Sequence, residues 1–364
     1  MKIRRKTKEI NVGGVLVGGE NKISVQSMVK ADPGDFEAIK NQIGEFKAAG
    51  CDIARMAVAN QKSVKTIAKL KELGASNKDY EIPLVADIHF NYKLAVESAF
   101  AGIDKIRINP GNIGTEDKVK AVADICRKKK IPIRIGVNGG SLEAHILEKY
   151  KTPNAEALAE SAIYNIKLLE RFDFCDIIVA IKSSDPKVMV EANLIAAEMC
   201  DYPFHIGVTE AGPAHMGLIK NAIGIGSLLL RGIGDTLRVS LTGDPVLEVC
   251  EGISILKSLG FYGKSIDIIS CPTCGRCKTD VIRIANELES KLSPIEKNLK
   301  ENMKIKIAVM GCAVNGPGEA KEADFGIAGG KDEFLFFKKG ETPKKIPADS
   351  AVEFLVEEAK RMTK

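Results

Sequence analysis

Four cysteines near the end of the chain have the spacing to bind a metal centre. Cys271, Cys274 and Cys277 fall within seven residues, and Cys312 follows in a Gly-Cys-Ala-Val-Asn-Gly-Pro-Gly-Glu segment that ends at Glu319. Two thiolates separated by two residues can bind a soft metal centre from one turn, and a third thiolate from a distant segment completes the site on folding. The spacing predicts a metal site, and the alternative is a redox-active or buried cysteine pair.

The same cysteines leave two kinds of metal site open. A structural zinc ion would use all four and would serve only to hold the fold. An iron–sulfur cluster would use three of them and keep a fourth position whose ligand can exchange for substrate. No C-x3-C-P run follows Cys277, which argues against a self-contained electron-transfer ferredoxin.

The composition is that of a globular protein in a reducing compartment. The chain has 364 residues, 45% hydrophobic and 28% charged, with a net charge of +5 and no tryptophan. Without a basic tract interleaved with aromatic residues, a nucleic-acid surface is not expected. The basic N-terminus lacks an apolar segment after it, and no run approaches a membrane span, so we expect neither a secretory signal nor a membrane anchor. The other five cysteines stand singly in apolar contexts, which indicates reduced thiols and a cytoplasmic location.

Short β-branched runs alternate with helix-period stretches through most of the chain. The expected strands are Ile23–Met28, Asp52–Val58, Pro83–His89, Lys105–Pro110, Pro132–Asn138, Asp176–Lys182, Phe204–Glu210 and Thr236–Thr242. The expected helices between or after them include Phe36–Ala49, Ser63–Leu73, Lys118–Lys130, Ala155–Arg171, Lys187–Cys200, Met216–Leu230 and Val246–Leu259. Eight strand–helix units favour a closed (β/α)8 TIM-type barrel, which we assign to residues 1–265.

The remaining residues, 266–364, predict a small α+β domain that carries the cysteines. Its expected strands are Ser265–Ser270, Met303–Met310, Ala323–Ala328 and Phe334–Phe337, and its expected helices are Thr279–Leu292 and Ala348–Arg361. Cys271 and Cys312 would each follow a strand directly. The polar stretch Leu292–Glu301 is interpreted as a mobile connection.

The predicted barrel strands end in a dense group of polar residues. They are Arg55, Asp87, Arg107, Arg134, Asn138, Lys182, Thr209, Glu210, Arg238 and Ser240. In such a barrel the carboxyl ends of the strands form the ligand-binding mouth. The cations could pair with local carboxylates in an internal salt-bridge layer. The sharper interpretation is a site for an anion of at least two charges, best a diphosphate, because arginine forks and amides match phosphate oxygens. A nucleotide is disfavoured, since neither a Walker A loop nor a G-x-G-x-x-G follows the first strand.

Several longer segments make the chain resemble a known enzyme family. They include Ser270–Arg276, Met310–Ala320, Val85–Phe90, Ile106–Gly114, Gly207–Gly212 and Gly232–Ser240. Together they resemble the 4-hydroxy-3-methylbut-2-enyl diphosphate synthase family, in its bacterial two-domain form, over nearly the whole length. The chain departs from the family at Val29-Lys30-Ala31, where Thr-Asn-Thr is usual, which puts the contacts of the loop after the first strand in doubt.

The resemblance implies a 4Fe-4S cluster held by Cys271, Cys274, Cys312 and Glu319, with Cys277 left out. It also implies that the barrel binds 2-C-methyl-D-erythritol 2,4-cyclodiphosphate. The implied substrate-binding residues are Arg55, Arg107, Arg134, Asn138, Lys182, Thr209, Arg238 and Ser240. Glu319 would be the exchangeable cluster ligand, and Glu210 and then Asp87 are the expected proton donors.

The activity implied is an isoprenoid-pathway oxidoreductase that opens and dehydrates this cyclic diphosphate with two electrons. Ferredoxin or flavodoxin would supply the electrons one at a time. A head-to-tail homodimer would bring the cluster domain of one chain to the barrel of the other. The alternative is a non-redox barrel lyase or aldolase that acts on a phosphorylated substrate and carries a structural zinc ion in its C-terminal domain.

Overall fold

A computed structural model of the chain describes residues 4–277, 279–312, 320–330, 332–339 and 343–363. The chain forms two compact units, Met1–Phe261 and Tyr262–Lys364. None of the helices described is both long and apolar enough to span a bilayer.

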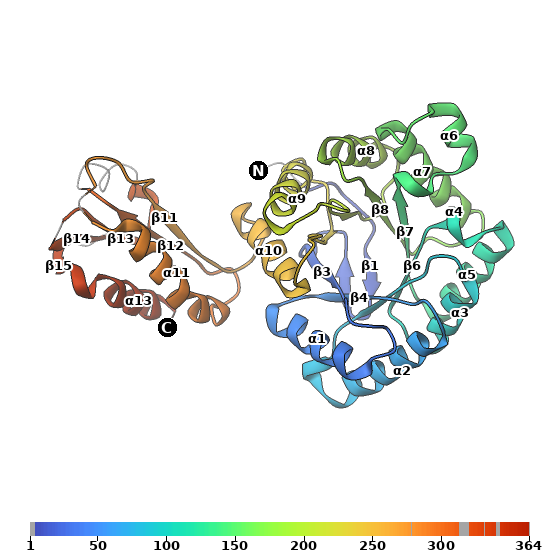
Figure 1. The fold of residues 1–364 in the computed structure, drawn as a ribbon, viewed down its shortest axis with the longest axis horizontal. Helices are drawn as coiled ribbons and strands as arrows, with labels where there is room; N and C mark the ends of the chain where they lie inside the picture. The colour runs from blue at the N-terminus through green and yellow to red at the C-terminus, as the bar shows by residue number, and fades with distance from the viewer. Residues whose placement is uncertain (1–3, 278, 313–319, 331, 340–342, 364) are drawn as a thin grey trace. The chain divides into compact units, whose positions relative to one another are not determined.

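The first unit is a barrel of parallel strands ringed by helices (Figure 1). Its sheet has the order β8-β7-β6-β5-β4-β3-β10-β9, and a parallel bridge between Val179 and Phe204 joins the two ends of that order. The strands are β3 (Ser24–Met28), β4 (Ile53–Ala57), β5 (Leu84–Asp87), β6 (Lys105–Ile108), β7 (Ile133–Asn138), β8 (Ile177–Lys182), β9 (His205–Ile206) and β10 (Thr236–Leu237). The predicted (β/α)8 barrel is confirmed, although β9 and β10 are much shorter than expected.

The helices begin where the sequence provides caps. The main helices are α1 (Phe36–Ala49), α2 (Gln61–Ser76), α3 (Tyr92–Phe100), α5 (Glu116–Lys129), α7 (Ala155–Glu170), α8 (Pro186–Met199), α9 (Ala214–Leu229) and α10 (Pro245–Ser258), with short helices α4 (Pro110–Ile113) and α6 (Ala144–Tyr150) between them. Asp35, Asn60, Asp185 and Asp244 each accept a hydrogen bond from a backbone N–H of the first helical turn. Such caps satisfy amide groups that have no partner within the helix, so each strand-to-helix turn is fixed locally.

A short hairpin before the barrel closes its amino-terminal end. Strands β1 (Ile10–Val12) and β2 (Val15–Val17) pair in antiparallel fashion. Their Ile10, Val12 and Val17 side chains pack in one buried cluster with side chains of β4, β5 and β8, namely Ile53, Val85 and Ile178. This end of the barrel is therefore apolar, unlike the carboxyl ends of the strands.

The second unit is built on a five-stranded sheet, and two α-helices belong to its described residues. Its strands are β11 (Ser265–Ser270), β12 (Lys304–Met310), β13 (Phe325–Ala328), β14 (Glu333–Lys338) and β15 (Lys344–Pro347), in that order across the sheet. Strands β11, β12 and β13 are parallel, and β14 and β15 are antiparallel to their neighbours. Helices α11 (Val281–Lys297) and α13 (Ala351–Met362) contribute Leu288 and Leu355 to its core. The α+β architecture predicted for this region is confirmed.

One connection in this unit differs from the prediction. Leu292–Glu301, expected to be a mobile linker, is helical as far as Lys297, and Pro294 lies inside the helix. The prediction was wrong because the apolar side chains of this stretch continue the buried face of α11. Leu292 and Leu299 are buried in the core of the unit, and Ile295 packs against it.

Candidate active site

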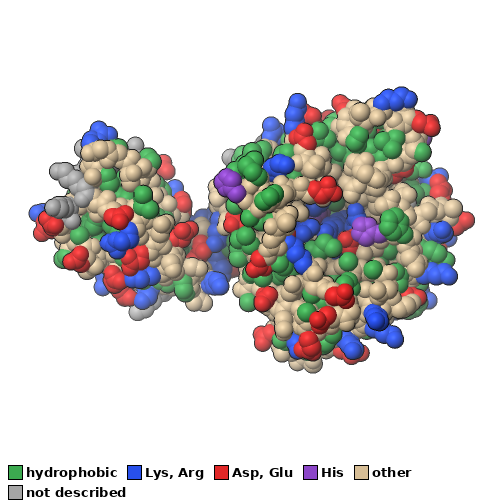
Figure 2. Space-filling model, in the orientation of Figure 1, with side chains coloured by type: hydrophobic (Ala, Val, Ile, Leu, Met, Phe, Trp, Pro, Cys, Tyr) green, Lys and Arg blue, Asp and Glu red, His purple; other side chains and the backbone are tan. Residues whose placement is uncertain are grey.

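The carboxyl ends of the barrel strands form a strongly cationic mouth. Figure 2 shows Lys and Arg side chains gathered in the hollow at the centre of the barrel face. Successive side chains of a strand point alternately into and out of the barrel. Inward-pointing side chains of neighbouring strands therefore come together. Arg107 on β6 and Arg134 on β7 are direct neighbours in the sheet register, as are Asn138 on β7 and Lys182 on β8.

Asp87, at the end of β5, is the centre of one half of the mouth. Its carboxylate accepts a hydrogen bond from Arg107 at 3.0 Å and lies 3.8 Å from Nε of Arg55 and 3.6 Å from Nε2 of His89. Burial acts to raise the pKa of this carboxyl group, but Arg55, His89 and Arg107 outweigh burial and hold the pKa well below its usual value. Asp87 is therefore ionised at neutral pH. A pocket of about 290 Å³ opens beside it, with His89 and Phe90 among its lining residues.

Arg55 is the most enclosed cation of this half. Its Nη2 and Nε atoms donate to the thioether sulfur of Met28 at 2.8 Å and 3.2 Å. A thioether sulfur is a weak acceptor. Burial, opposed by the charge of Asp87, lowers the pKa of Arg55 to about 10. Arg55 thus keeps its charge at neutral pH, and most of its hydrogen-bonding capacity remains for a ligand.

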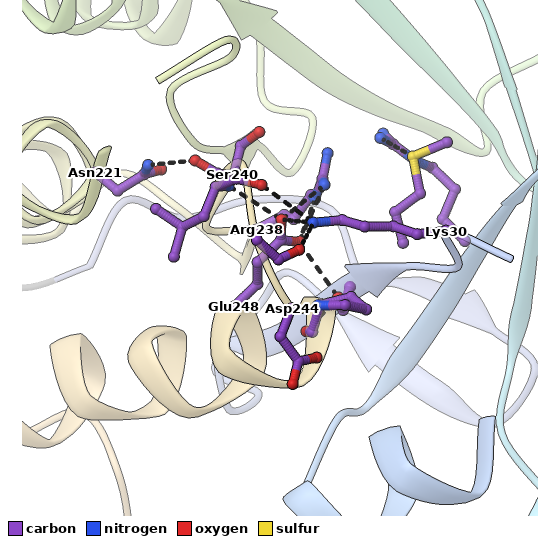
Figure 3. A network of polar contacts seen from close by, with 12 residues as sticks. Lys30, Asn221, Arg238, Ser240, Asp244 and Glu248 are labelled. Atoms are coloured by element: carbon purple, nitrogen blue, oxygen red, sulfur yellow. Dashed lines mark hydrogen bonds and ion pairs between the residues drawn. The ribbon is translucent and has the colours of Figure 1, made fainter. Parts of the chain in front are cut away.

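Glu248, in the first turn of α10, is the centre of the other half (Figure 3). Its buried carboxylate accepts a hydrogen bond from Arg238 at 3.0 Å and pairs with Lys30 at 3.1 Å. It also accepts the backbone N–H of Leu241 at 3.0 Å. Ser240, in the same segment, is tied to α9 through its carbonyl, which accepts from the Asn221 amide at 3.2 Å (Figure 3). The segment after β10 is therefore fixed on both sides.

Arg134 and Lys182 lie between these two halves, and neither forms an ion pair with a carboxylate in the described part of the chain. Arg134 is 1% exposed, and its Nε and Nη1 atoms have no hydrogen-bond partner among the described residues. Burial and then the charges of neighbouring arginines lower the pKa of Arg134 and of Lys182. A buried cation without a counter-charge is costly, so the pair favours a negatively charged ligand at this point.

Two glycines are needed for the side chains to reach these positions. A Cβ atom at Gly136 would lie 2.5 Å from Nε of Arg107, and one at Gly207 would lie 2.2 Å from the carbonyl oxygen of Arg238. Larger residues would push the Arg107 guanidinium or the end of β10 out of place.

The remaining predicted residues line the rim. The Asn138 side chain accepts a hydrogen bond from the Ser141 hydroxyl at 2.7 Å, and Ser141 is in turn bonded to Asn109. The backbone N–H of Thr209 donates to the carbonyl of Ser183 at 3.2 Å. Glu210 is exposed and has left-handed backbone with φ of 51°. The structure thus puts Glu210 in the loop after β9 and not among the buried cations.

The charge balance at the mouth decides between the two interpretations of the cations. Six basic side chains stand beside the two carboxylates of Asp87 and Glu248. They are Lys30, Arg55, Arg107, Arg134, Lys182 and Arg238. An internal salt-bridge layer accounts for four of these cations at most. The excess favours an anion with more than one charge.

Sequence reasoning missed Glu248, Lys30 and Lys105. Glu248 belongs to a helix and not to a strand, but its position just after the Asp244-Pro245 start of α10 places it at the top of the barrel. Lys30 lies in the loop that departs from the family pattern. Lys105 precedes Arg107 by two residues on β6, and this spacing puts both side chains on the same face of a strand.

The cysteines stand at the carboxyl ends of β11 and β12 in the second unit. Ser270 pairs with Val309 in the sheet register, so Cys271 and the Gly311-Cys312 pair follow neighbouring parallel strands. The backbone N–H of Gly311 donates to the Cys271 sulfur at 3.2 Å. Hydrogen bonds from the backbone and side chain of Arg276 lower the pKa of Cys274. The same side-chain hydrogen bond, and then the charges of Cys274 and Cys312, raise the pKa of Arg276. Three thiols are thus linked through Gly311 and Arg276.

Cys277 is held differently from the other three. Its thiol donates to the carbonyl of Thr279 at 3.1 Å, and a Cβ atom at Gly311 would lie 2.3 Å from its sulfur. The Cys277 sulfur therefore packs against the backbone at Gly311. Glu319, the expected fourth ligand, lies outside the described residues.

The donor set fits an iron–sulfur cluster. In the described ranges, no three Cys, His, Asp or Glu side chains stand close enough together to hold one metal ion. Amide and guanidinium donors beside the thiols stabilise negative charge on sulfur, as an anionic cluster requires.

Comparisons with known proteins find matches to both units of the chain. The sequence model of the GcpE TIM-barrel domain matches residues 7–253, and that of the GcpE protein C-terminal domain matches residues 267–361. The chain is 52% identical over 353 residues to the 4-hydroxy-3-methylbut-2-en-1-yl diphosphate synthase (flavodoxin) of Clostridium perfringens, which covers 97% of this chain and 98% of the relative. It is 50% identical to the protein of that name from Caldanaerobacter subterraneus, over 100% of this chain and 99% of the relative.

Among solved structures, dihydropteroate synthase from Yersinia pestis has a similar fold. The TM-score is 0.50 at 12% sequence identity, with 69% of this chain and 97% of that chain covered. At this identity the likeness extends only to the fold.

Proposed function

The chain belongs to the GcpE family, and we propose that it reductively opens and dehydrates 2-C-methyl-D-erythritol 2,4-cyclodiphosphate to give 4-hydroxy-3-methylbut-2-enyl diphosphate. The observation that carries the proposal is the excess of buried cations over carboxylates at the barrel mouth, which calls for a ligand with several negative charges. About half of all residues are identical to those of relatives named for this activity, over nearly the whole chain.

In this proposal the barrel binds the diphosphate part of the substrate. Arg134 and Lys182 lie between the two carboxylate-held groups, so they would contact the phosphates directly. Arg55 and Arg107, held by Asp87, and Arg238, held by Glu248, would donate from either side. Asn138, Thr209 and Ser240 at the rim would supply neutral donors. When the ring opens, the diphosphate becomes the leaving group, and these cations stabilise the negative charge that develops on it.

Glu210 is the first candidate for proton delivery, and Asp87 is the second. Asp87 is a poor acid at neutral pH because its pKa lies well below the usual range and its oxygens are occupied by Arg107 and Arg55. Its role would be to orient these arginines. Glu210 is exposed in the loop after β9, and its carboxylate is therefore free to approach a substrate oxygen.

In the second unit, Cys271, Cys274 and Cys312 would hold a 4Fe-4S cluster with Glu319 as the fourth ligand. The cluster would supply the two electrons of the reduction singly. The N–H of Gly311 and the guanidinium of Arg276 would stabilise the negative charge of the thiolates. Cys277, whose thiol is hydrogen-bonded to the carbonyl of Thr279, would not be a cluster ligand.

The partners follow from the same activity. A flavodoxin, which is part of the name of the relatives, or a ferredoxin would deliver the electrons. A head-to-tail homodimer would bring the cysteine-bearing unit of one chain to the barrel mouth of the other. Since none of the nine cysteines forms a disulfide, we place the protein in the reducing cytoplasm.

Turnover of the cyclic diphosphate by protein purified and reconstituted without oxygen tests this function. The protein is supplied with dithionite or with reduced flavodoxin, and the product is identified by mass spectrometry. We expect 4-hydroxy-3-methylbut-2-enyl diphosphate, in proportion to bound iron and sulfide. A colourless protein that contains one zinc ion per chain and yields no product would overturn the proposal in favour of a non-redox lyase.

A further inference from the structure

A layer of buried polar side chains lies inside the barrel, below the mouth. Several of their atoms have no hydrogen-bond partner in the described part of the chain, and all of these side chains are fully buried: Ser24, Gln26, Lys105 and His205. A barrel of this type is normally filled by branched apolar residues, and buried polar groups are normally hydrogen-bonded. The layer therefore needs an explanation beyond packing.

The layer has a definite place in the barrel. His205 and Thr236 are neighbours in the sheet register, as are Thr236 and Ser24, so these three residues lie at one level. Lys105 precedes the mouth residue Arg107 by two positions on β6 and therefore lies below it. The β1–β2 hairpin closes the barrel beyond this level with apolar side chains.

Lys105 is the unexplained group in this layer. Its side chain is fully buried, and its amine has no hydrogen-bond partner among the residues that the structure describes. The charges that act on it come from Arg134 on β7 and Arg55 on β4, and both are positive. The neighbouring strand β5 presents Val85 opposite Lys105, β3 presents Ser24 and Gln26, and β10 presents Thr236.

The other titratable groups facing this part of the barrel offer Lys105 no counter-charge. His205 on β9 and Lys182 on β8 share its cationic surroundings, since Arg134 and Arg55 act on both. The two nearby carboxylates serve other cations, with Asp87 bound to Arg107 and Glu248 bound to Arg238. Burial and then Arg134 lower the pKa of Lys105 well below its usual value, as expected for an amine without water beside fixed positive charges.

We propose that Lys105 is an uncharged amine in the free protein and takes up a proton from solvent when a dianionic phosphate group binds above it. The inference rests on the proposed anion site at the mouth. The ligand offsets the positive charge of Arg134 and Arg55, so the ammonium form of Lys105 becomes stable. Lys105 then adds a positive charge beneath the phosphate, and the free protein avoids the repulsion that a permanent charge would cause.

Lys105, and not His205, is the group that gains the proton. His205 is fully buried and feels the same positive charges of Arg134 and Arg55 as Lys105 does. An amine is intrinsically far more basic than an imidazole. His205 keeps its neutral ring, whose Nδ1 lies 3.5 Å from the hydroxyl of Thr236.

Calorimetric titration with sulfate tests the proposal. Sulfate is a tetrahedral dianion with no proton to release near neutral pH, so any proton taken up comes to the protein. The whole chain is titrated in buffers of different ionisation enthalpy, as wild type, Lys105→Met and His205→Gln. We expect up to one proton taken up per sulfate by the wild type and by His205→Gln, and none by Lys105→Met.

The affinity of the wild type alone gives a second readout that does not depend on the variants folding. Because the bound state holds more protons, sulfate should bind more tightly as the pH falls, by at most about tenfold per pH unit. Sulfate binding without proton uptake, or uptake that persists in Lys105→Met, overturns the inference and leaves the anion site intact. Uptake that is lost in His205→Gln but not in Lys105→Met also overturns it. A folded wild type that binds no sulfate overturns the anion site itself, and this inference with it.

Discussion

The barrel mouth and the cysteine loops both stand at the carboxyl ends of parallel strands, yet their reactive groups are held in different ways. At the mouth, carboxylates inside the barrel fix the cations, with Asp87 bound to Arg107 and Glu248 bound to Arg238. In the second unit, Cys274 is exposed, and backbone groups such as the N–H of Gly311 make the contacts to sulfur.

The difference indicates that the two sites depend on their ligands to different degrees. The mouth is assembled by the protein's own ion pairs and is ready for an anion before one arrives. The cysteine site is only partly assembled by the protein and would be completed by the cluster that it binds. Metal centres of this kind couple binding to local folding, whereas preorganised anion sites do not.

Replacement of a cysteine ligand should have the largest effect and should leave the barrel unaffected. For Cys312→Ser we expect loss of the iron and sulfide and a fall in activity of more than about a hundredfold, because a ligand supports the cluster at least as strongly as its surroundings do. Pyrophosphate affinity should stay at the wild-type value. A variant that keeps its iron and its turnover would remove Cys312 from the site, and lost pyrophosphate binding would show that the two sites are not independent.

Replacement of Asp87 should destabilise the mouth. Asp87→Asn leaves Arg107 and Arg55 buried without their shared counter-charge, which should cost roughly 3 to 5 kcal/mol in the free energy of unfolding. The measurement is urea unfolding of wild type and variant, compared at neutral pH.

The same pair predicts the sign of the pH dependence. The pKa of Asp87 is lowered on folding, so its contribution to stability is complete above the unfolded-state value of about 4 and is lost as the pH falls below it. The difference in stability between wild type and Asp87→Asn should therefore shrink in acid. A difference that stays constant through this range would show that the charge of Asp87 is not what stabilises the mouth.

Replacement of Glu248 should weaken substrate binding more than it slows the chemistry. Glu248→Gln removes the charge that orients Arg238 and pairs with Lys30, and we expect KM to rise about tenfold with a smaller change in kcat. Lys30→Met is the matched control, because it leaves the contact between Glu248 and Arg238 in place and should change KM less. Equal effects of the two variants would show that orientation of Arg238 is not the role of Glu248.

The smallest effect is expected at Cys277. Its thiol donates a hydrogen bond to the carbonyl of Thr279 and packs against Gly311. Cys277→Ser should therefore keep the cluster and stay within about twofold of wild-type activity. Iron analysis beside Cys312→Ser makes the comparison direct. If Cys277→Ser lost as much iron as Cys312→Ser, the result would identify Cys277 as a cluster ligand.

Periodicity in the sequence predicted most of the barrel, because parallel strands covered on both faces are short apolar runs between amphipathic helices. Arg55, Arg107 and Arg134 were found in advance for the same reason, since inward positions at the strand ends meet at the mouth. The β1–β2 hairpin was missed because its strands have three residues each, too few to show a period. The helical end of α11 was missed because charged residues separate its apolar positions.

The partners of the mouth residues were less accessible to sequence reasoning. Glu248 pairs with Lys30 from more than two hundred positions away, and only the closed barrel brings these residues together. The unpaired state of Lys105 could not be read from its position in a strand, because it depends on which charges surround it in three dimensions. The position of Glu319 stays a prediction of the resemblance.

The most direct test of the central claim is the affinity of cluster-free protein for pyrophosphate, measured calorimetrically for wild type and Arg134→Met. If the barrel alone assembles the diphosphate site, cluster-free wild type binds pyrophosphate. Removal of the Arg134 guanidinium, whose Nε and Nη1 find no hydrogen-bond partner among the described residues, then weakens binding by at least about tenfold. Failure of the folded, cluster-free wild type to bind, or equal binding by Arg134→Met, would contradict the account.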